Sequence, residues 1–131
     1  ASVFVRWAVA PAMLALSGWS RRAEITCDRA GLLCSSDVDV STRALAKLAL
    51  GSVKLYEEFN LEAFLEQYEE GQEGIGRVTE ITASHPFLPK RVKALRKFAE
   101  SKLYREHVGL EGGINMEEVD EQVHGIIKVL G

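Results

Sequence analysis

The chain of 131 residues lacks the features that mark sheet proteins and nucleic-acid-binding proteins. It has no sustained alternation of β-branched residues, so the sequence predicts few or no strands. Its net charge is −3, and it has no basic stripe with interleaved aromatic residues, which argues against a nucleic-acid partner. Hydrophobic residues make up 47% and charged residues 27% of the chain. This balance is typical of an ordinary globular protein.

Cysteine is also scarce, and its spacing argues against a disulfide. Cys27 and Cys34 are seven positions apart. On one helix their α-carbons would be separated by about 10 Å, which exceeds the roughly 7 Å that a disulfide can bridge. We therefore predict reduced, buried thiols that behave as small apolar side chains. This pattern favours a reducing compartment.

The apolar stretch over residues 3–19 resembles neither a membrane span nor a signal peptide. A span requires about 20 apolar residues, whereas this stretch contains Arg6 and Pro11. A signal peptide carries its basic residues before the apolar run, whereas Arg21 and Arg22 follow it. We expect a core helix that starts upstream of the first residue, with a juxtamembrane helix as the alternative. The expected location is accordingly membrane-associated or cytoplasmic.

Helical patterns dominate the rest of the chain, so we predict an all-α fold. The expected helices cover 11–33, 42–50, 53–68 as one or two helices, a segment opened by Pro86 and Pro89, and a segment after Asn115. Ser41, Asn60 and Asn115 are predicted N-caps. The helix after Pro89 should bury Val92, Leu95, Phe98 and Leu103. The glycines at 109, 112 and 113 are predicted to form a linker.

Two carboxylates one turn apart stand out on the first predicted helix. On a wheel of about 100° per residue, Glu24 and Asp28 lie on a narrow polar stripe bordered by apolar residues. Such a stripe is predicted to point inward, into a polar cleft. Buried carboxylates are costly unless they are paired, hydrogen-bonded or metal-bound. Pairing of Glu24 with Arg21 on the same helix is therefore the alternative to metal binding. The opposite side, predicted to face water, carries Arg22, Thr26 and Arg29.

These residue types suit a hydrolytic zinc site, which requires three protein ligands and an open position for water. A helical glutamate such as Glu24 can be one ligand. A carboxylate one turn further, such as Asp28, can accept a hydrogen bond from a ligating histidine and fix its tautomer. His85, held by Pro86 at a predicted helix start, can donate to the oxyanion that forms during hydrolysis.

The segment from Trp19 to Leu33 resembles the third-ligand helix of the HtpX-like zinc metallopeptidases, relatives of the CaaX prenyl proteases. That family carries a Glu-x-x-Ala-Asp-Arg pattern, which reads Glu24-x-x-Cys27-Asp28-Arg29 in this chain. Cys27 therefore replaces a small residue. The later Ser84-His85-Pro86, with Arg91 just beyond it, is similar to the family's His-Pro…Arg segment.

The resemblance implies a role for each matching residue. Glu24 would bind the single zinc ion, and Asp28 would orient a ligating histidine. His85 would face the substrate carbonyl and the oxyanion, and Arg91 would support that site. The substrate would be a polypeptide that is cleaved at internal peptide bonds, and the enzyme would be of the protein quality control type.

One departure from the family pattern is large. The first two ligands and the general base of such enzymes come from a His-Glu-x-x-His helix, and no two of His85, His107 and His124 have that spacing. His107 and His124 are predicted to be surface residues. We therefore expect residues 1–131 to be the C-terminal portion of a larger peptidase, inactive alone, whose partner is the missing N-terminal catalytic segment. The alternative is an inactive helical interaction or scaffold domain derived from such a peptidase.

Within this single helical domain, we expect 1–35 to be the third-ligand helix, 36–108 the helical body, and 109–131 a linker and last helix. The last helix has an apolar seam that packs either on the body or on a second copy of the chain. If this seam packs on a second copy of the chain, the protein forms a homo-oligomer through residues 115–130.

Overall fold

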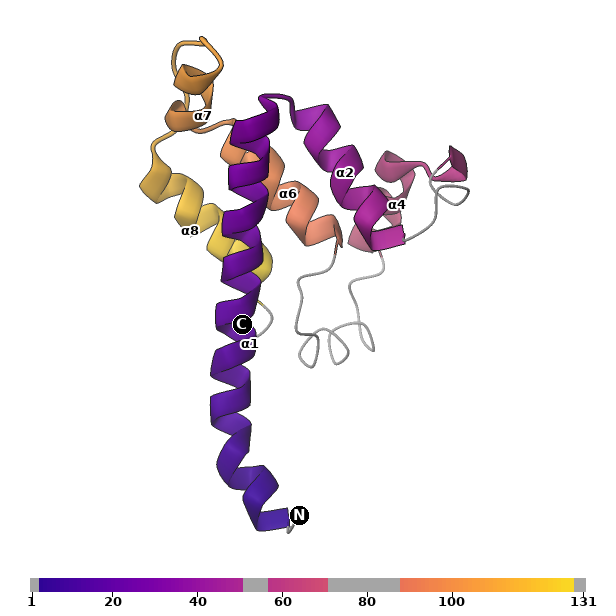
Figure 1. The fold of residues 1–131 in the computed structure, drawn as a ribbon, viewed down its shortest axis with the longest axis vertical. Coiled ribbons are helices and arrows are strands. Elements are labelled where there is room, and N and C mark those ends of the chain that lie inside the picture. Colours follow the sequence, from indigo (N-terminus) through magenta and orange to yellow (C-terminus); the bar gives the residue numbers. More distant parts are fainter. Residues whose placement is uncertain (1–2, 51–56, 71–87, 129–131) are drawn as a thin grey trace.

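A computed structural model describes residues 3–50, 57–70 and 88–128 of the chain (Figure 1). Its helices are α1 (Val3–Ser35), α2 (Val38–Leu50), α4 (Leu61–Glu70), α6 (Leu88–Ala99), α7 (Lys102–His107) and α8 (Met116–Ile127). No strand occurs in these three ranges, where Ser101 and Ile114 form an isolated bridge. The predicted all-α fold is confirmed.

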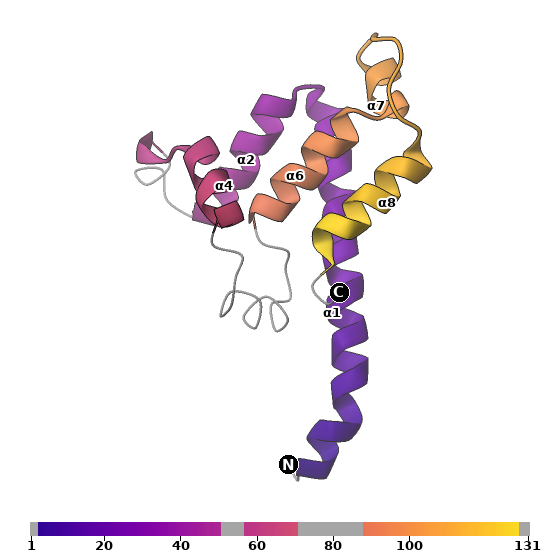
Figure 2. The ribbon, with the colours of Figure 1, turned by 180° about the vertical axis from the view of Figure 1, so that it is seen from behind.

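Helix α6 lies at the centre of the helical body, between α2 and α8, and also packs on α1 and α4 (Figure 2). Its buried residues include Val92, Leu95 and Phe98, as the sequence predicted. On α8, Val119, Val123 and Ile127 are buried, because this helix lies along α6 of the same chain. The apolar seam of α8 is therefore used within the chain, and the homo-oligomer stays a prediction.

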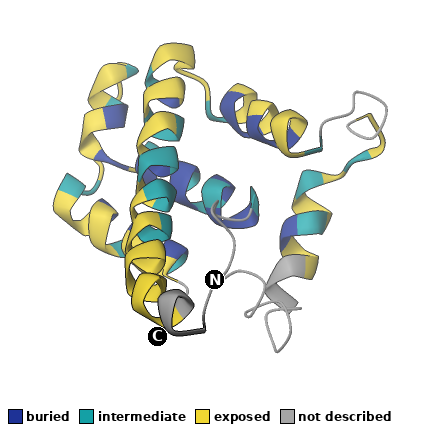
Figure 3. Cartoon of the chain, turned by 60° about the horizontal axis from the view of Figure 1, so that its bottom comes forward, coloured by how far each residue is buried: buried dark blue, intermediate teal, exposed yellow. Residues whose placement is uncertain are grey.

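The first half of α1 extends away from this body (Figure 1), and it is mostly exposed (Figure 3). The helix begins at Val3 rather than near residue 11 and continues through Pro11. A proline removes one backbone hydrogen bond, but the surrounding alanines and leucines favour helix. Within the described ranges, no helix combines the length and apolarity that crossing a membrane requires. The large apolar side chains exposed on this half are Trp7, Val9, Met13, Leu14, Leu16 and Trp19.

Two of the three predicted N-caps, Asn60 and Asn115, are confirmed, and Ser41 is not. Asn60 Oδ1 accepts from the N–H of Ala63, and Asn115 Oδ1 accepts from the N–H of Glu118, so both predicted caps are confirmed. Ser41 is wrong as a cap, because α2 begins three residues earlier and buries it. Asp37 takes the capping position instead, and its Oδ1 lies 3.0 Å from the N of Val40.

The helix that starts at Leu88 ends sooner than expected. Ser101 is fully buried and caps the separate helix α7. The backbone of Lys102 donates to the carbonyl of Ile114, which holds the chain in this break. Leu103 therefore lies on α7 and is exposed, so its predicted burial is wrong. The two thiols of α1 are free and exposed, so their predicted burial is also wrong.

The Gly113 backbone yields a stability prediction. Its φ is +111°, and an added Cβ would lie 2.8 Å from the carbonyl oxygen of Glu100 and 2.8 Å from the N of Lys102. We expect Gly113→Ala to lower the free energy of unfolding by about 2–3 kcal/mol, through backbone strain and this clash. Urea denaturation followed by circular dichroism measures it. Gly112→Ala is the matched control, since φ is +77° there but the space is open. Equal losses in the two variants would contradict the role of close packing.

Candidate functional site

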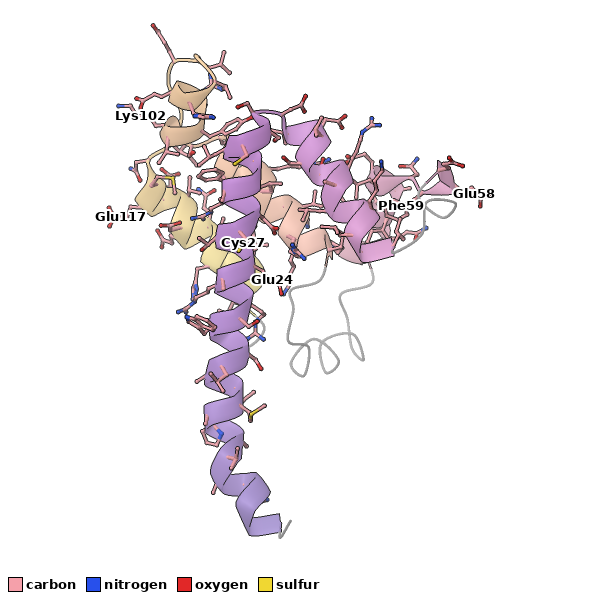
Figure 4. The ribbon with its side chains drawn as sticks, viewed as in Figure 1. Glu24, Cys27, Glu58, Phe59, Lys102 and Glu117 are labelled. Carbon is pink, nitrogen blue, oxygen red and sulfur yellow. The ribbon has the colours of Figure 1, made fainter. Side chains whose placement is uncertain are left out.

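The two carboxylates of the polar stripe face one arginine on α6. Arg91 Nε donates to Asp28 Oδ2 at 2.9 Å, and Arg91 Nη2 donates to Asp28 Oδ1 at 2.7 Å. Arg91 Nη1 lies 3.2 Å from Glu24 Oε2 in a second ion pair. Figure 4 shows Glu24 on the side of α1 that faces α6. The inward direction predicted for this stripe is therefore confirmed.

Burial strengthens these contacts. The side chain of Asp28 is 7% exposed, that of Glu24 is 21% exposed and that of Arg91 is 24% exposed. The hydrogen bonds that Arg91 donates to Asp28 are the main cause that raises the pKa of Arg91. Desolvation opposes this rise, and the charges of Asp28 and Glu24 add to it. The guanidinium therefore stays charged. The three side chains together have a formal net charge of one negative, which favours a nearby cation.

On the far side of α1, Arg22 and Thr26 are exposed, as predicted, but Arg29 is packed against the body. The side chain of Arg29 is 19% exposed, and its Nη1 lies 2.7 Å from Asp120 Oδ1 on α8. Its guanidinium carbon lies 5.2 Å from the ring centroid of Phe98. The helical wheel correctly places Arg29 on the side of α1 opposite to the polar stripe. It does not indicate that α8 covers Arg29 on this side.

The histidines differ in what the structure shows of them. His85, with Ser84 and Pro86, lies outside the described residues, so its proposed role stays a prediction. His107 and His124 are exposed, as expected. The sequence did not indicate that His107 Nε2 lies 2.8 Å from the carbonyl oxygen of Leu33, a contact that joins α7 to the end of α1.

Glu24 is chemically suited to be one metal ligand, but the described residues do not provide a complete set of metal ligands. In the described ranges no three His, Cys, Asp or Glu side chains lie close enough together to hold a metal ion. Asp28 uses both oxygens on Arg91, although a carboxylate has about four lone-pair sites and can accept a further donor. Any zinc bound by Glu24 therefore requires ligands from elsewhere.

Comparison with known proteins identifies the class. Residues 2–99, from α1 to the end of α6, match the model of peptidase family M48, and the chain belongs to this family. It is similar to the plastoglobule-localized metallopeptidase 48, chloroplastic, of Arabidopsis thaliana, with 34% identity over 95 residues. The matched region covers 66% of this chain and 28% of that relative. No solved structure matches the chain. The resemblance to the HtpX-like metallopeptidases is thereby confirmed.

The Asp28–Arg91 pair yields a second stability prediction. Arg91→Gln leaves two partly buried carboxylates one turn apart, so we expect a loss of about 2–4 kcal/mol in the free energy of unfolding. Asp28→Asn should cost less, because Arg91 keeps Glu24. The double variant should cost less than the sum of the single variants by about 1–3 kcal/mol, which is the coupling expected for contacting groups.

Chemical denaturation of the four proteins completes this cycle. The control is Arg43→Gln, which removes an exposed ion pair to Asp39 on α2 and should change stability by no more than about 0.5 kcal/mol. If the losses of unfolding free energy in the two single variants add up to the loss in the double variant, the contact between Arg91 and Asp28 does not contribute to stability.

Proposed function

We propose that this chain is part of a zinc-dependent endopeptidase and that α1 contributes Glu24 as one of the three zinc ligands. Membership of peptidase family M48 supports the class of reaction. The observation that carries the ligand assignment is the arrangement of Glu24, Asp28 and Arg91. It places the partly exposed side chain of Glu24 in a group of three side chains whose formal net charge is negative. The proposed substrates are polypeptides.

In this proposal the zinc ion would supply a polarised water for attack on a peptide carbonyl. Asp28 keeps its two bonds to Arg91 and accepts a further hydrogen bond from a ligating histidine, which fixes that imidazole. Arg91 holds the two carboxylates of α1 in place. His85 stabilises the oxyanion. The general base and the two histidine ligands come from a His-Glu-x-x-His helix that these 131 residues do not contain.

The exposed half of α1 supports the existence of further structure around it. Large apolar side chains lie on all sides of the helix between Trp7 and Trp19. A helix that is hydrophobic all round is normally buried in a large protein or in a membrane. We propose that the catalytic helix of the same enzyme packs here. Association with a membrane surface is a further part of the proposal, in keeping with the plastoglobule location named for the relative.

A second candidate function is an inactive interaction or scaffold domain. It is favoured by the absence of a three-ligand cluster from the described ranges. The coding sequence that contains this chain discriminates between the two candidates. The enzyme requires a His-Glu-x-x-His motif within it, and the scaffold does not.

Zinc content tests the ligand assignment. The complete protein encoded by that sequence is produced as wild type, Glu24→Gln and the control Glu66→Gln, which changes an exposed residue of α4. We expect about one zinc per wild-type and control polypeptide by mass spectrometry. Glu24→Gln should bind zinc at least about tenfold more weakly, because a charged ligand is lost. Casein cleavage should follow the metal content. Unchanged zinc affinity in Glu24→Gln would refute its role as a ligand.

His85 is tested separately from the metal. We expect His85→Ala to keep its zinc and to lower kcat by about 10²–10³-fold, with little change in KM, since an oxyanion donor acts mainly in the transition state. Steady-state kinetics on a fluorogenic peptide measure this. A parallel loss of zinc would assign His85 to the metal site instead, and an unchanged kcat would remove it from catalysis.

A further inference from the structure

A cavity lies on the side of α1 that faces α8, away from Arg91. Its volume is about 220 Å³. Its floor is apolar and consists of Ile25 from α1 with Val123 and Ile127 from α8, all of which are buried. Because α8 begins at Met116, beyond the residues 2–99 that match family M48, this cavity combines a family helix with a helix outside the match.

The rim of the cavity is predominantly basic. It carries Arg22, Arg29 and His124, with Asp120 as the acidic residue. Asp120 is already neutralised by Arg29 Nη1 at 2.7 Å. Neither the guanidinium of Arg22 nor the imidazole of His124 has an ion-pair or hydrogen-bond partner within the described ranges. The rim therefore keeps one unmatched positive charge, on Arg22, that lies at the edge of an apolar floor.

We propose that this cavity binds a small aliphatic carboxylate. The guanidinium fork of Arg22 matches the geometry of a carboxylate and binds it with charge-assisted hydrogen bonds. The aliphatic body then lies over Ile25, Val123 and Ile127 and covers the small apolar area that these side chains leave exposed. The cavity is smaller than the roughly 300–1,000 Å³ of sites for drug-sized ligands, so the ligand has only a few carbon atoms.

The position of the cavity links it to the carboxylate cluster on the opposite side of α1. Ile25 of the floor directly follows Glu24, and Arg29 of the rim directly follows Asp28. A ligand in the cavity contacts α1 and α8 together and so holds the helix that carries Glu24. The binding itself does not depend on peptidase activity, and it is tested without it.

The test is an NMR titration of the 131-residue chain, labelled with ¹⁵N, at constant ionic strength. The probes are isovalerate, its neutral amide isovaleramide and inorganic phosphate. We expect isovalerate to shift the amide signals of Thr26, Val123 and His124 with a Kd of about 1–10 mM. The neutral amide should bind at least about tenfold more weakly, because the charge-assisted bonds are lost. Phosphate should also bind more weakly, because it leaves the apolar floor uncovered.

Two variants locate the binding. Arg22→Gln changes an exposed residue, so the fold should persist, and we expect its affinity for isovalerate to fall by about fivefold or more. Arg43→Gln, on α2, should bind as the wild type does. Equal affinity for isovalerate and isovaleramide would overturn charge recognition, and phosphate binding as tightly as isovalerate would overturn the role of the floor. Unchanged affinity in Arg22→Gln would overturn the location, and no shift with isovalerate would overturn the site itself.

Discussion

The guanidinium of Arg91 allows the two carboxylates of α1, Glu24 and Asp28, to lie inside the protein. Glu24 and Asp28 are like charges one turn apart, an arrangement that destabilises a helix on its own. Burial adds a desolvation cost. A single planar cation on α6, the helix at the centre of the body, offsets both effects by contacting both carboxylates. The orientation of α1 on α6 and the formation of the negatively charged cluster therefore depend on the same contact.

Those parts of the fold and site that follow from local sequence were predicted well. The helical class, the caps at Asn60 and Asn115 and the inward stripe of Glu24 and Asp28 all depend on residues within one or two turns. Two local predictions were wrong, because Asp37 rather than Ser41 caps α2 and because α1 begins at Val3. Other errors concern contacts between distant segments. The partner of Arg29 is Asp120, which lies 91 positions away, and no periodicity in α1 records it. Leu103 was assigned to the wrong surface because Ser101, through its pairing with Ile114, ends the preceding helix.

Helix α1 has two packed sides and two unequal halves. From Ile25 onward it is packed, with α6 on the side of Asp28 and α8 on the side of Arg29. Before that point it exposes apolar residues in every direction. The boundary between the halves falls beside Glu24. The carboxylate of Glu24 is therefore held by Arg91 of the body and lies next to the exposed half, a position that suits the ligand role proposed for it.

The asymmetry of the Arg91 contacts decides which carboxylate is suited to a metal. Asp28 receives two hydrogen bonds from Arg91, at 2.9 and 2.7 Å, and is the more deeply buried of the two. Glu24 receives the longer contact, at 3.2 Å, and keeps more exposure. Charge-assisted pairs weaken as they lengthen and gain solvent, so displacing Glu24 from Arg91 costs less than displacing Asp28. A divalent cation competing with one guanidinium would therefore take Glu24 and leave the Asp28–Arg91 pair intact.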